Sequence, residues 1–333
     1  MKTIKKHKRL NKNMLITDVV IVGTGNIAIK HVQIIKKKYP KKIITLYNYR
    51  KKSLSPAIKK NFDNISSDIN LIIKNDSKSF VIIASPANFH INHAIRFAKK
   101  GFHLFVEKPL SINTKSIKTL KNIVLDNNLY LYIGYNLRFL DSIKKMSDII
   151  HSKIYGKIKH ANIFALSNFI FWRKNKSFKK TVTANYSLGG GAITELSHEL
   201  DYTLELFGIP KIIKNTNGSD QKHDLDIETK SSIKFYYNDK IVNIYLDILS
   251  SYNKRQIYIY FEKADALIDL KNNLIIIQNN KDVYKKYTFK QSINDTYDDQ
   301  MIDFISKLHR KDFKNFVDSN YLPNMIMNLR KSA

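Results

Sequence analysis

A short glycine-containing segment near the start of the chain has the spacing of a turn that binds phosphate. It follows a run of valine and isoleucine, precedes a helical pattern, and reads Gly23-Thr24-Gly25-Asn26-Ile27-Ala28. In such a turn the first glycine permits a tight bend, the second lets the backbone approach a pyrophosphate, and the small last residue lets helix and strand pack closely. The amides at the helix start then face the phosphates. The segment predicts dinucleotide binding, and the alternative is a plain tight turn.

The residues after the second expected strand bear on which dinucleotide binds. A Rossmann domain that selects NAD commonly has an acidic residue there, about 20 residues after the turn, to bind the ribose 2′-hydroxyl. No carboxylate occurs between Asp18 and Asp63, and the strand end carries Arg50 and Lys51 instead. These cations suit a 2′-phosphate, although a general excess of lysine would also place them there. We expect both residues to bind the cofactor, and we expect NADP in preference to NAD.

The elements that would position this turn alternate between strand and helix up to about Tyr135. Short apolar runs between helical patterns imply a parallel, doubly wound sheet. The segment Ile65–Asn75 fits a helix or a strand equally well. The expected strands are Leu15–Val22, Ile43–Tyr47, Phe80–Ala84, Phe102–Phe105 and Leu129–Ile133. The expected helices are Asn26–Lys38, Asn88–Lys100 and Thr114–Asp126.

The pattern changes in the second part of the chain, where long alternating runs predict a mostly antiparallel sheet with one face packed on helices. We therefore expect an α/β protein with three segments: a basic tail (1–14), a Rossmann domain (15–135) and an α/β domain for substrate binding and oligomerisation (136–333). The expected strands are Lys157–Leu166, Thr229–Tyr237, Ile241–Leu249, Gln256–Phe261, Ala266–Leu270 and Leu274–Gln278. The expected helices are Leu137–His151, Gly189–Phe207 and Asp298–Leu308.

Composition narrows the classes of function. The chain has no cysteine, which excludes disulfides, cysteine-ligated metals and thiol catalysis. We expect a cytoplasmic protein with an exposed basic tail rather than a signal peptide. The formal net charge of +29 would by itself suggest nucleic acid or an anionic membrane. Because the lysines are scattered through a chain rich in Lys, Asn and Ile, we attribute the charge to composition, and expect neither partner. The histidines show no metal-ligand spacing, and we expect His31, His93 and His103 to be helix or core residues.

Three further motifs, in this order, resemble the Gfo/Idh/MocA family of sugar oxidoreductases. The likeness covers almost the whole chain beyond the basic tail. It extends to Gly134–Phe139, similar to the family's crossover into the second domain, and to Asn328–Ser332 at the C-terminal end. The motifs are Ser85-Pro86-Ala87-Asn88-Phe89-His90, Glu107-Lys108-Pro109, and Gly189-Gly190-Gly191 with the helix that they open.

The resemblance implies a Rossmann domain joined to an α/β domain with a large open sheet. It also implies a catalytic pair. In such enzymes the Lys of Glu-Lys-Pro, here Lys108, lies beside the nicotinamide and the substrate hydroxyl, and a His of the glycine-opened helix, here His198, acts as acid and base. The chemistry fits these residue types. A histidine titrates near neutrality and can take the proton of an alcohol, whereas a lysine stabilises negative charge on its oxygen.

The other candidates surround this pair. The resemblance places Asn88 near the nicotinamide ribose and Glu107 near Lys108. The segment at Trp172 would face the substrate, or be a surface loop with a packing tryptophan, and Arg138 would bind a substrate anion or cap a helix. The candidate cofactor residues are Gly23, Thr24, Gly25, Asn26, Ile27, Arg50, Lys51, Ser85, Pro86, Asn88, His90, Glu107 and Lys108. The candidate substrate residues are Lys108, Asn136, Arg138, Trp172, Arg173 and His198.

The sequence departs from the family pattern next to the histidine. Many members have Asp four residues before it, where this chain has Thr194. Glu195, His198 and Asp201 fall at i, i+3 and i+6, a spacing that places them on one face of a helix. We count both acids as catalytic candidates, and the partner of His198 is Glu195, Asp201 or neither.

The pattern Ser197–Tyr202 is similar to that of a subgroup often found in surface-polysaccharide pathways. Together these features and this resemblance predict an NAD(P)-dependent oxidoreductase acting on a sugar or nucleotide-sugar in surface-glycan biosynthesis. The alternatives are a cyclitol dehydrogenase, a reductase of a non-sugar carbonyl, and a dinucleotide-binding protein without catalysis. The family resemblance and the long apolar strands also predict a homodimer or homotetramer joined through the C-terminal sheet.

Overall fold

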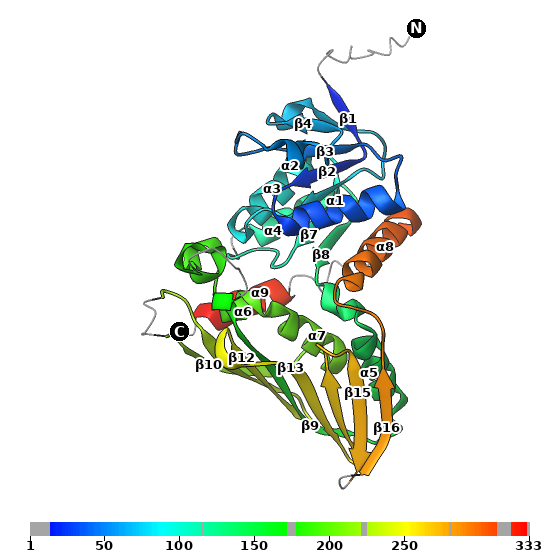
Figure 1. Cartoon of the computed structure of the whole chain (residues 1–333), viewed down its shortest axis with the longest axis vertical. Helices are drawn as coiled ribbons and strands as arrows, with labels where there is room; N and C mark the ends of the chain where they lie inside the picture. Colours follow the sequence, from blue (N-terminus) through cyan, green and yellow to red (C-terminus); the bar gives the residue numbers. More distant parts are fainter. Residues whose placement is uncertain are drawn as a thin grey trace.

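The computed structural model describes residues 14–114, 116–171, 178–220, 225–279, 282–311 and 321–331. Two sheets dominate it (Figure 1). A six-stranded parallel sheet has the order β4-β3-β2-β6-β7-β8, and an eight-stranded sheet has the order β10-β11-β12-β9-β13-β14-β15-β16. The expected fold class, a Rossmann domain followed by an α/β domain with a large and mostly antiparallel sheet, is confirmed.

The first sheet is built from short strands that are buried on both faces, which is why they read as near-continuous Val/Ile runs. Strand order reverses between β2 and β6, and ligands of such sheets bind at this point, outside the carboxyl ends of the strands. The strands are β2 (Val19–Val22), β3 (Ile44–Tyr47), β4 (Asn64–Ser66), β6 (Phe80–Ile83), β7 (His103–Glu107) and β8 (Leu131–Gly134). The helices are α1 (Asn26–Lys38), α2 (Pro56–Lys59), α3 (Ala87–Lys99) and α4 (Ile117–Asp126).

The single strand expected over Leu15–Val22 is wrong. The chain forms β1 (Leu15–Thr17), bends at Asp18, and continues as β2. The bend has a cause, because the Asp18 carboxylate accepts a hydrogen bond from the Ile43 amide at 2.8 Å. The ambiguous segment after β4 contains a short 3-10 helix, η1 (Ile69–Leu71), and β5 (Ile72–Lys74), which pairs with β1 in a separate two-stranded sheet.

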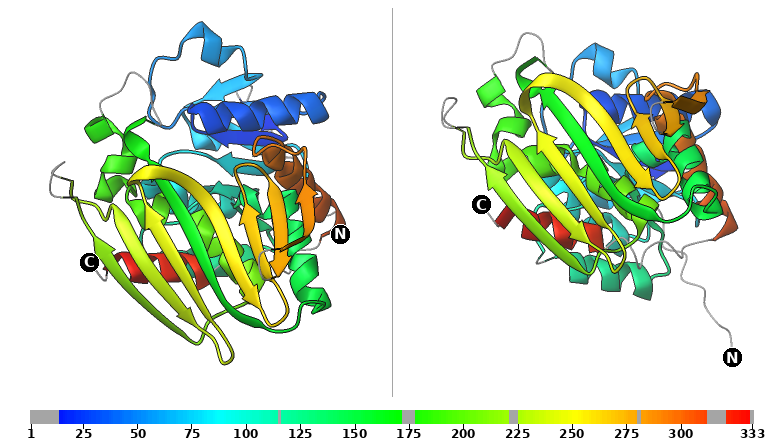
Figure 2. Two further views of the ribbon diagram at one scale, coloured as in Figure 1. Left: turned by 60° about the horizontal axis from the view of Figure 1, so that its bottom comes forward. Right: turned by 90° about the horizontal axis from the view of Figure 1, so that it is seen from below.

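The second sheet is antiparallel except where β12 and β9 run parallel. Buried and half-exposed residues alternate along its strands, so one face packs on helices. Figure 2 shows the other face open toward the viewer, with helices behind it. The strands are β9 (Ile158–Asn168), β10 (Ile212–Gly218), β11 (Lys230–Tyr236), β12 (Ile241–Asp247), β13 (Leu249–Phe261), β14 (Asp265–Asp269), β15 (Leu274–Asn279) and β16 (Asp282–Thr288).

Two helices expected to be continuous are interrupted. The first is divided into a 3-10 turn, η2 (Asn136–Phe139), and α5 (Asp141–Ser152), with an extended residue between them. The second is divided at Leu196 into α6 (Ala192–Glu195) and α7 (Ser197–Phe207). Glu195 therefore ends one helix and His198 lies in the first turn of the next. The expectation that Glu195, His198 and Asp201 share one continuous helix is wrong.

The last two helices of the chain pack on different domains. Helix α8 (Asp295–Arg310) packs Met301, Phe304 and Leu308 into the core of the Rossmann domain, and Figure 1 shows it beside α1. Helix α9 (Tyr321–Lys331) packs against α6 and α7. Among the described residues, none of the helices combines the length and the apolar character needed to cross a membrane.

Candidate active site

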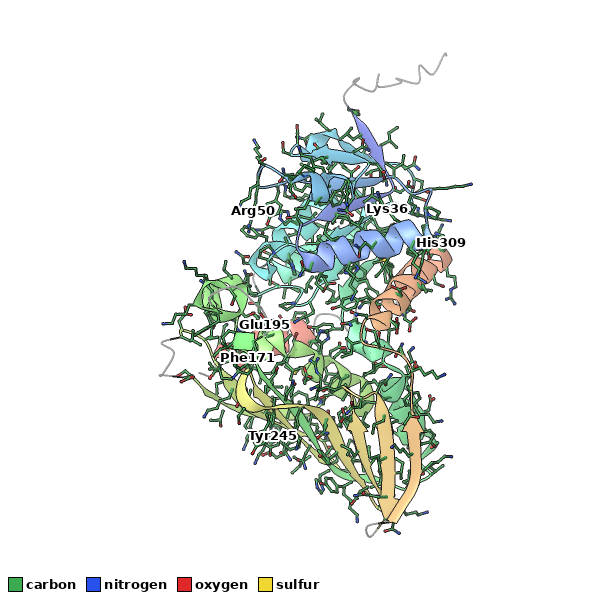
Figure 3. The ribbon with its side chains drawn as sticks, in the orientation of Figure 1. Lys36, Arg50, Phe171, Glu195, Tyr245 and His309 are labelled. Atoms are coloured by element: carbon green, nitrogen blue, oxygen red, sulfur yellow. The ribbon has the colours of Figure 1, made fainter. Side chains whose placement is uncertain are left out.

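A cavity of about 550 Å³ lies at the carboxyl edge of the Rossmann sheet. We call it the first cavity. Its walls come from the glycine turn after β2 and from the residues that follow β3, β6 and β7. The C-terminal domain closes it with Gly189 and the end of α6. Figure 3 labels Arg50 in the Rossmann domain and Glu195 in the C-terminal domain, two residues that contribute to opposite walls.

The glycine turn has the geometry that a pyrophosphate needs. Gly23 has a φ of +132°, and a Cβ there would lie 2.8 Å from the Ala84 carbonyl carbon, so no other residue fits without movement. A Cβ on Gly25 would meet no described atom within 4 Å, so this backbone faces open space. Gly25 also caps the 13-residue helix α1, whose first turn carries no acidic residue. The free amides of that turn fit an anionic group.

Most residues predicted for the turn line the first cavity. Gly23, Thr24, Gly25 and Ile27 do so, whereas Asn26 begins α1 with an exposed side chain and does not. After β3, Arg50 and Lys52 line the cavity, and Lys51 does not. Lys51 is exposed, with a φ of +52°. The sequence shows three consecutive cations here, but it does not show that Lys52 rather than Lys51 lines the cavity, because the left-handed backbone of Lys51 cannot be read from it.

Aromatic rings hold Arg50 at the edge of the cavity. Its guanidinium carbon lies 5.4 Å from the ring centroids of both Tyr49 and Phe89. Cation–π contacts of this kind fix a long side chain that would otherwise move freely. Within the described residues, no acidic side chain lies within ion-pair distance of Arg50 or Lys52, so this end of the cavity carries uncompensated positive charge.

The segment after β6 is tied to the segment after β7 through a buried histidine. The ring nitrogens of His90 lie 2.7 Å from the Ser85 carbonyl oxygen and 2.8 Å from that of Pro109. Burial lowers the pKa of His90 below its usual value. Ser85, Pro86 and His90 line the cavity, and the buried Ser85 hydroxyl has no partner among the described residues. Asn88 lies on α3 outside the lining of the cavity.

Lys108 reaches across the cavity from the end of β7 to the other domain. Its ammonium donates to the backbone carbonyls of Glu195, at 2.9 Å, and Thr194, at 3.4 Å. These carbonyls end α6, so Lys108 links the Rossmann domain to the helices that carry His198. Glu107 lies beside it, with one carboxylate oxygen 2.6 Å from Nε2 of His31.

His198 lies behind the wall of the first cavity rather than on it. The side chain is buried and meets the Tyr135 ring edge-on, with centroids 5.6 Å apart. Its Nδ1 has no hydrogen-bond partner among the described residues. Burial holds the pKa of His198 well below its usual value, and the positive charges of Lys108 and Arg255 act in the same direction. A neutral imidazole is the form that can accept a proton.

The two candidate acids have separate environments. Glu195 lines the first cavity and accepts a hydrogen bond of 2.6 Å from the Thr183 hydroxyl. Asp201 is buried, and both of its oxygens bind Arg138, at 2.7 Å from Nε and 2.6 Å from Nη2. This ion pair lines a different hollow of about 560 Å³, which we call the second cavity, together with Glu205 and Lys307.

The other predicted substrate residues do not meet at one place. Arg138 belongs to the second cavity, and buried Asn136 donates to the Thr296 hydroxyl of α8 at 2.7 Å. Trp172 and Arg173 lie outside the described residues. The structure also reveals a residue to which the sequence assigned no role. Arg330 of α9 donates to the carbonyl of Gly190 at 3.0 Å and so supports the glycine turn before α6.

Comparisons with known proteins agree with this architecture. The Gfo/Idh/MocA family model, described as an oxidoreductase family with an NAD-binding Rossmann fold, matches residues 17–135. An uncharacterized oxidoreductase of Streptococcus pneumoniae is 23% identical over 60% of this chain and 53% of its own length. Glucose-6-phosphate 3-dehydrogenase of Bacillus subtilis is 22% identical over 66% of this chain and 61% of its own length. The chain thus spans less than two thirds of these relatives.

Solved structures share the fold over nearly the whole chain. Levoglucosan dehydrogenase in complex with NADH has a TM-score of 0.80 at 16% identity, covering 96% of this chain and 97% of that one. UDP-N-acetylglucosamine 3-dehydrogenase from Acidithiobacillus ferrooxidans has a TM-score of 0.73 at 16% identity, covering 96% and 98%. The family model thus matches the Rossmann domain of this chain, and solved dehydrogenase structures share its fold over nearly the whole chain.

Proposed function

We propose that the protein is an NAD(P)-dependent oxidoreductase that transfers a hydride between nicotinamide and a secondary alcohol or ketone of a sugar or nucleotide-sugar. One observation carries the proposal. The first cavity contains both the turn suited to a pyrophosphate and the ammonium of Lys108, at the edge of the sheet where dinucleotides bind. A protein that only bound the dinucleotide would have no need for a cation at this position.

Lys108 and His198 would have different roles in the reaction. Oxidation of a secondary alcohol gives a ketone, a hydride and a proton, and a bound nicotinamide would supply the hydride acceptor. Lys108 would hold the reacting oxygen and stabilise its negative charge. His198, kept neutral by burial and by nearby positive charge, would accept the proton in oxidation and return it in reduction. Glu195 remains as the candidate acid that lines the first cavity.

We further propose that NADP is bound in preference to NAD. Arg50 and Lys52 supply two cations where an NAD-selective domain commonly has an acid, and the Tyr49 and Phe89 rings hold Arg50 in place. Cofactors of both kinds occur among the similar proteins. Levoglucosan dehydrogenase is in complex with NADH, and scyllo-inositol 2-dehydrogenase (NADP(+)) of Bacillus subtilis is 24% identical over 48% of this chain. A comparison of the dissociation constants of the two cofactors tests the proposal.

For the substrate we propose a sugar or nucleotide-sugar of surface-glycan biosynthesis. Relatives named for glucose-6-phosphate and UDP-N-acetylglucosamine support a phosphorylated sugar. A cyclitol is the second candidate, favoured by the relative named for scyllo-inositol. Cofactor reduction should be followed with nucleotide-sugars, sugar phosphates, free sugars and inositols. Turnover of an inositol or a free hexose far above that of every nucleotide-sugar would reject the nucleotide-sugar.

We propose that the enzyme is a homodimer or homotetramer joined through the open face of the large sheet. Stacked rings lie along this face, with centroids 4.1 Å apart for His160 and Tyr260 and 5.0 Å apart for Phe164 and Tyr245. Aromatic rings on an open sheet face favour contact with another protein surface. Light scattering at micromolar concentration should give a multiple of 38.8 kDa, and a monomer alone would reject the proposal.

A further inference from the structure

A buried pair, His31 and Glu107, lies beneath the first cavity. His31 is on α1, two turns after the glycine turn, and its side chain is completely buried. Its Nε2 lies 2.6 Å from Oε1 of Glu107, at the end of β7. The Glu107 side chain is 13% exposed and lines the cavity next to Lys108. The pair therefore connects the helix that begins at the phosphate turn to the strand end that carries Lys108.

The surroundings of His31 determine where the proton of the pair lies. Its other nitrogen, Nδ1, is buried without a hydrogen-bond partner among the described residues. The ring packs edge-on against Phe105 and Tyr297, with centroids 5.0 Å and 6.1 Å away. An imidazolium would bury an N–H at Nδ1 with no acceptor, which is costly. The network therefore places the ring hydrogen on Nε2, which donates to Oε1 of Glu107.

The carboxylate is also fixed in position. Gly134, its neighbour on β8, packs directly on it, and a Cβ there would lie 3.2 Å from the carboxyl carbon and from both oxygens. Glu107 thus presents one held negative charge at the Lys108 end of the cavity, whereas Arg50 and Lys52 lie at the other. The other acid of the cavity wall, Glu195, comes from the opposite domain and bonds Thr183.

We propose that the Glu107 carboxylate, held in place by His31 and Gly134, makes this end of the cavity favour the oxidised cofactor over the reduced one. The inference rests on the proposed function. A dinucleotide whose pyrophosphate lies on the glycine turn and whose 2′-phosphate lies near Arg50 directs its nicotinamide toward Glu107 and Lys108. The oxidised ring carries a positive charge that the reduced ring lacks. A held carboxylate therefore attracts one form and not the other, and His31 acts as a positioning residue.

The test is a ratio of affinities, which needs no turnover. Dissociation constants of NADP+ and NADPH are measured by calorimetry for the wild type and for Glu107→Gln, a change that removes the charge at nearly constant shape. We expect NADP+ binding to weaken about three- to tenfold, the order expected for one partly screened charge pair, with NADPH changed by less than twofold. Equal weakening of both forms, or no change in either, would overturn the proposal.

Variants of His31 test whether its hydrogen-bond donor sets the ratio of the NADP+ and NADPH affinities. His31→Leu removes the donor that holds the carboxylate in position, so the affinity ratio should move in the same direction as in Glu107→Gln. His31→Gln retains an amide donor and should restore the ratio toward the wild type. His103→Leu is the matched control, because His103 begins the same strand outside the cavity and bonds the Ser77 carbonyl instead. Its ratio should equal that of the wild type.

The results distinguish a failure of the proposed function from a failure of this inference alone. If the wild type binds none of NADP+, NADPH, NAD+ and NADH, the proposed function is wrong, and this inference fails with it; if it binds only NAD+ and NADH, the same ratio is measured with that pair. If the wild type binds both and Glu107→Gln leaves their ratio unchanged, only this inference is wrong. If His31→Leu does not fold, as judged by circular dichroism, Glu107→Gln still decides, because its side chain retains the size and hydrogen-bonding capacity of the native one.

Discussion

The two cavities of the molecule carry their charges in opposite ways. In the first, Arg50, Lys52 and Lys108 have no acidic partner within ion-pair distance among the described residues, and Lys108 binds only backbone carbonyls. In the second, each cation is matched. The pairs are Arg138 with Asp201 at 2.6 Å and Glu205 at 3.2 Å, Lys307 with Asp303 at 2.8 Å, and Lys144 with Asp299 at 3.7 Å.

This difference separates a binding site from a structural one. A cation without a partner is available to an anionic ligand, whereas a cation that is already paired must lose its partner before it can bind another. Sequence spacing assigned Lys108, Arg138 and Asp201 to one active site. From the charge pattern we propose that Lys108 belongs to the site and that the Arg138–Asp201 pair belongs to the joint between η2 and α7.

The strongest test of the comparison is the loss of Lys108. Lys108→Ala should lower turnover by about 10²–10⁴-fold, because no other described cation contacts the carbonyls at the end of α6 and the reacting oxygen would lose its stabilisation. Affinity for the dinucleotide should change by no more than about threefold. The matched control is Lys144→Ala in the second cavity, which should leave turnover unchanged. Equal losses in the two variants would remove the distinction between the cavities.

The next largest effect is expected for His198. If His198 carries the proton, His198→Asn should lower turnover by about 10²-fold or more. Because its pKa lies well below the usual 6.5, the neutral ring persists as pH falls past that value. Alcohol oxidation by the wild type should therefore decline only below about pH 6.5, as the base becomes protonated. The pH profile of kcat/KM measures this. A decline beginning above pH 6.5 in the wild type would contradict the assignment of His198 as the base.

The sequence predicted the Rossmann domain well, because strands buried on both faces are recorded as Val/Ile runs and because local geometry requires glycine at position 23. It did not predict the break at Leu196, since leucine favours helices. The break has a tertiary cause. In a continuous helix the Glu195 carbonyl would accept from the Glu199 amide; it accepts instead from Lys108, and the Glu199 amide donates to Leu196.

The partner of Asp201 could not be predicted either, because it too is set by a tertiary contact. Helical spacing relates Asp201 to His198, three residues away, but carries no information on a side chain 63 positions earlier in the chain. Only the packing of η2 against α7 brings Arg138 to it. Local patterns thus identify which residues lie on an element, while long-range contacts decide which of them remain free for chemistry.

Asp201→Asn tests this structural assignment. Removing the charge of a buried ion pair leaves Arg138 partly unsatisfied, and because the Arg138 side chain is 44% exposed, water offsets part of the loss. We expect the free energy of unfolding to fall by about 1–3 kcal/mol, measured by urea denaturation, with turnover within about threefold of the wild type. A loss of turnover as large as in His198→Asn, at unchanged stability, would make Asp201 the partner of His198.

Arg50→Ala tests the uncompensated end of the first cavity. A charged hydrogen bond to a phosphate contributes about 1.5–3 kcal/mol, so NADPH affinity should fall about tenfold or more, whereas NADH affinity should change by less than about twofold. Fluorescence titration of both cofactors measures this. Wild-type protein that binds NADH as tightly as NADPH would contradict the NADP preference from the outset, whatever the variant does.

The smallest expected effect compares two neighbouring lysines. Lys52 lines the first cavity and Lys51 does not, yet both carry the same charge at nearly the same place in the chain. They therefore contribute almost equally to any general positive field. Asparagine is the matched substitution, because it tolerates the left-handed backbone of Lys51. Since a solvent-exposed charge contact contributes about 0.2–1 kcal/mol, Lys52→Asn should weaken NADPH binding about two- to fivefold, and Lys51→Asn by less than that. Titration at low and moderate salt should show the difference shrinking as screening increases. Equal effects of the two changes would mean that scattered charge, rather than contact within the first cavity, attracts the cofactor.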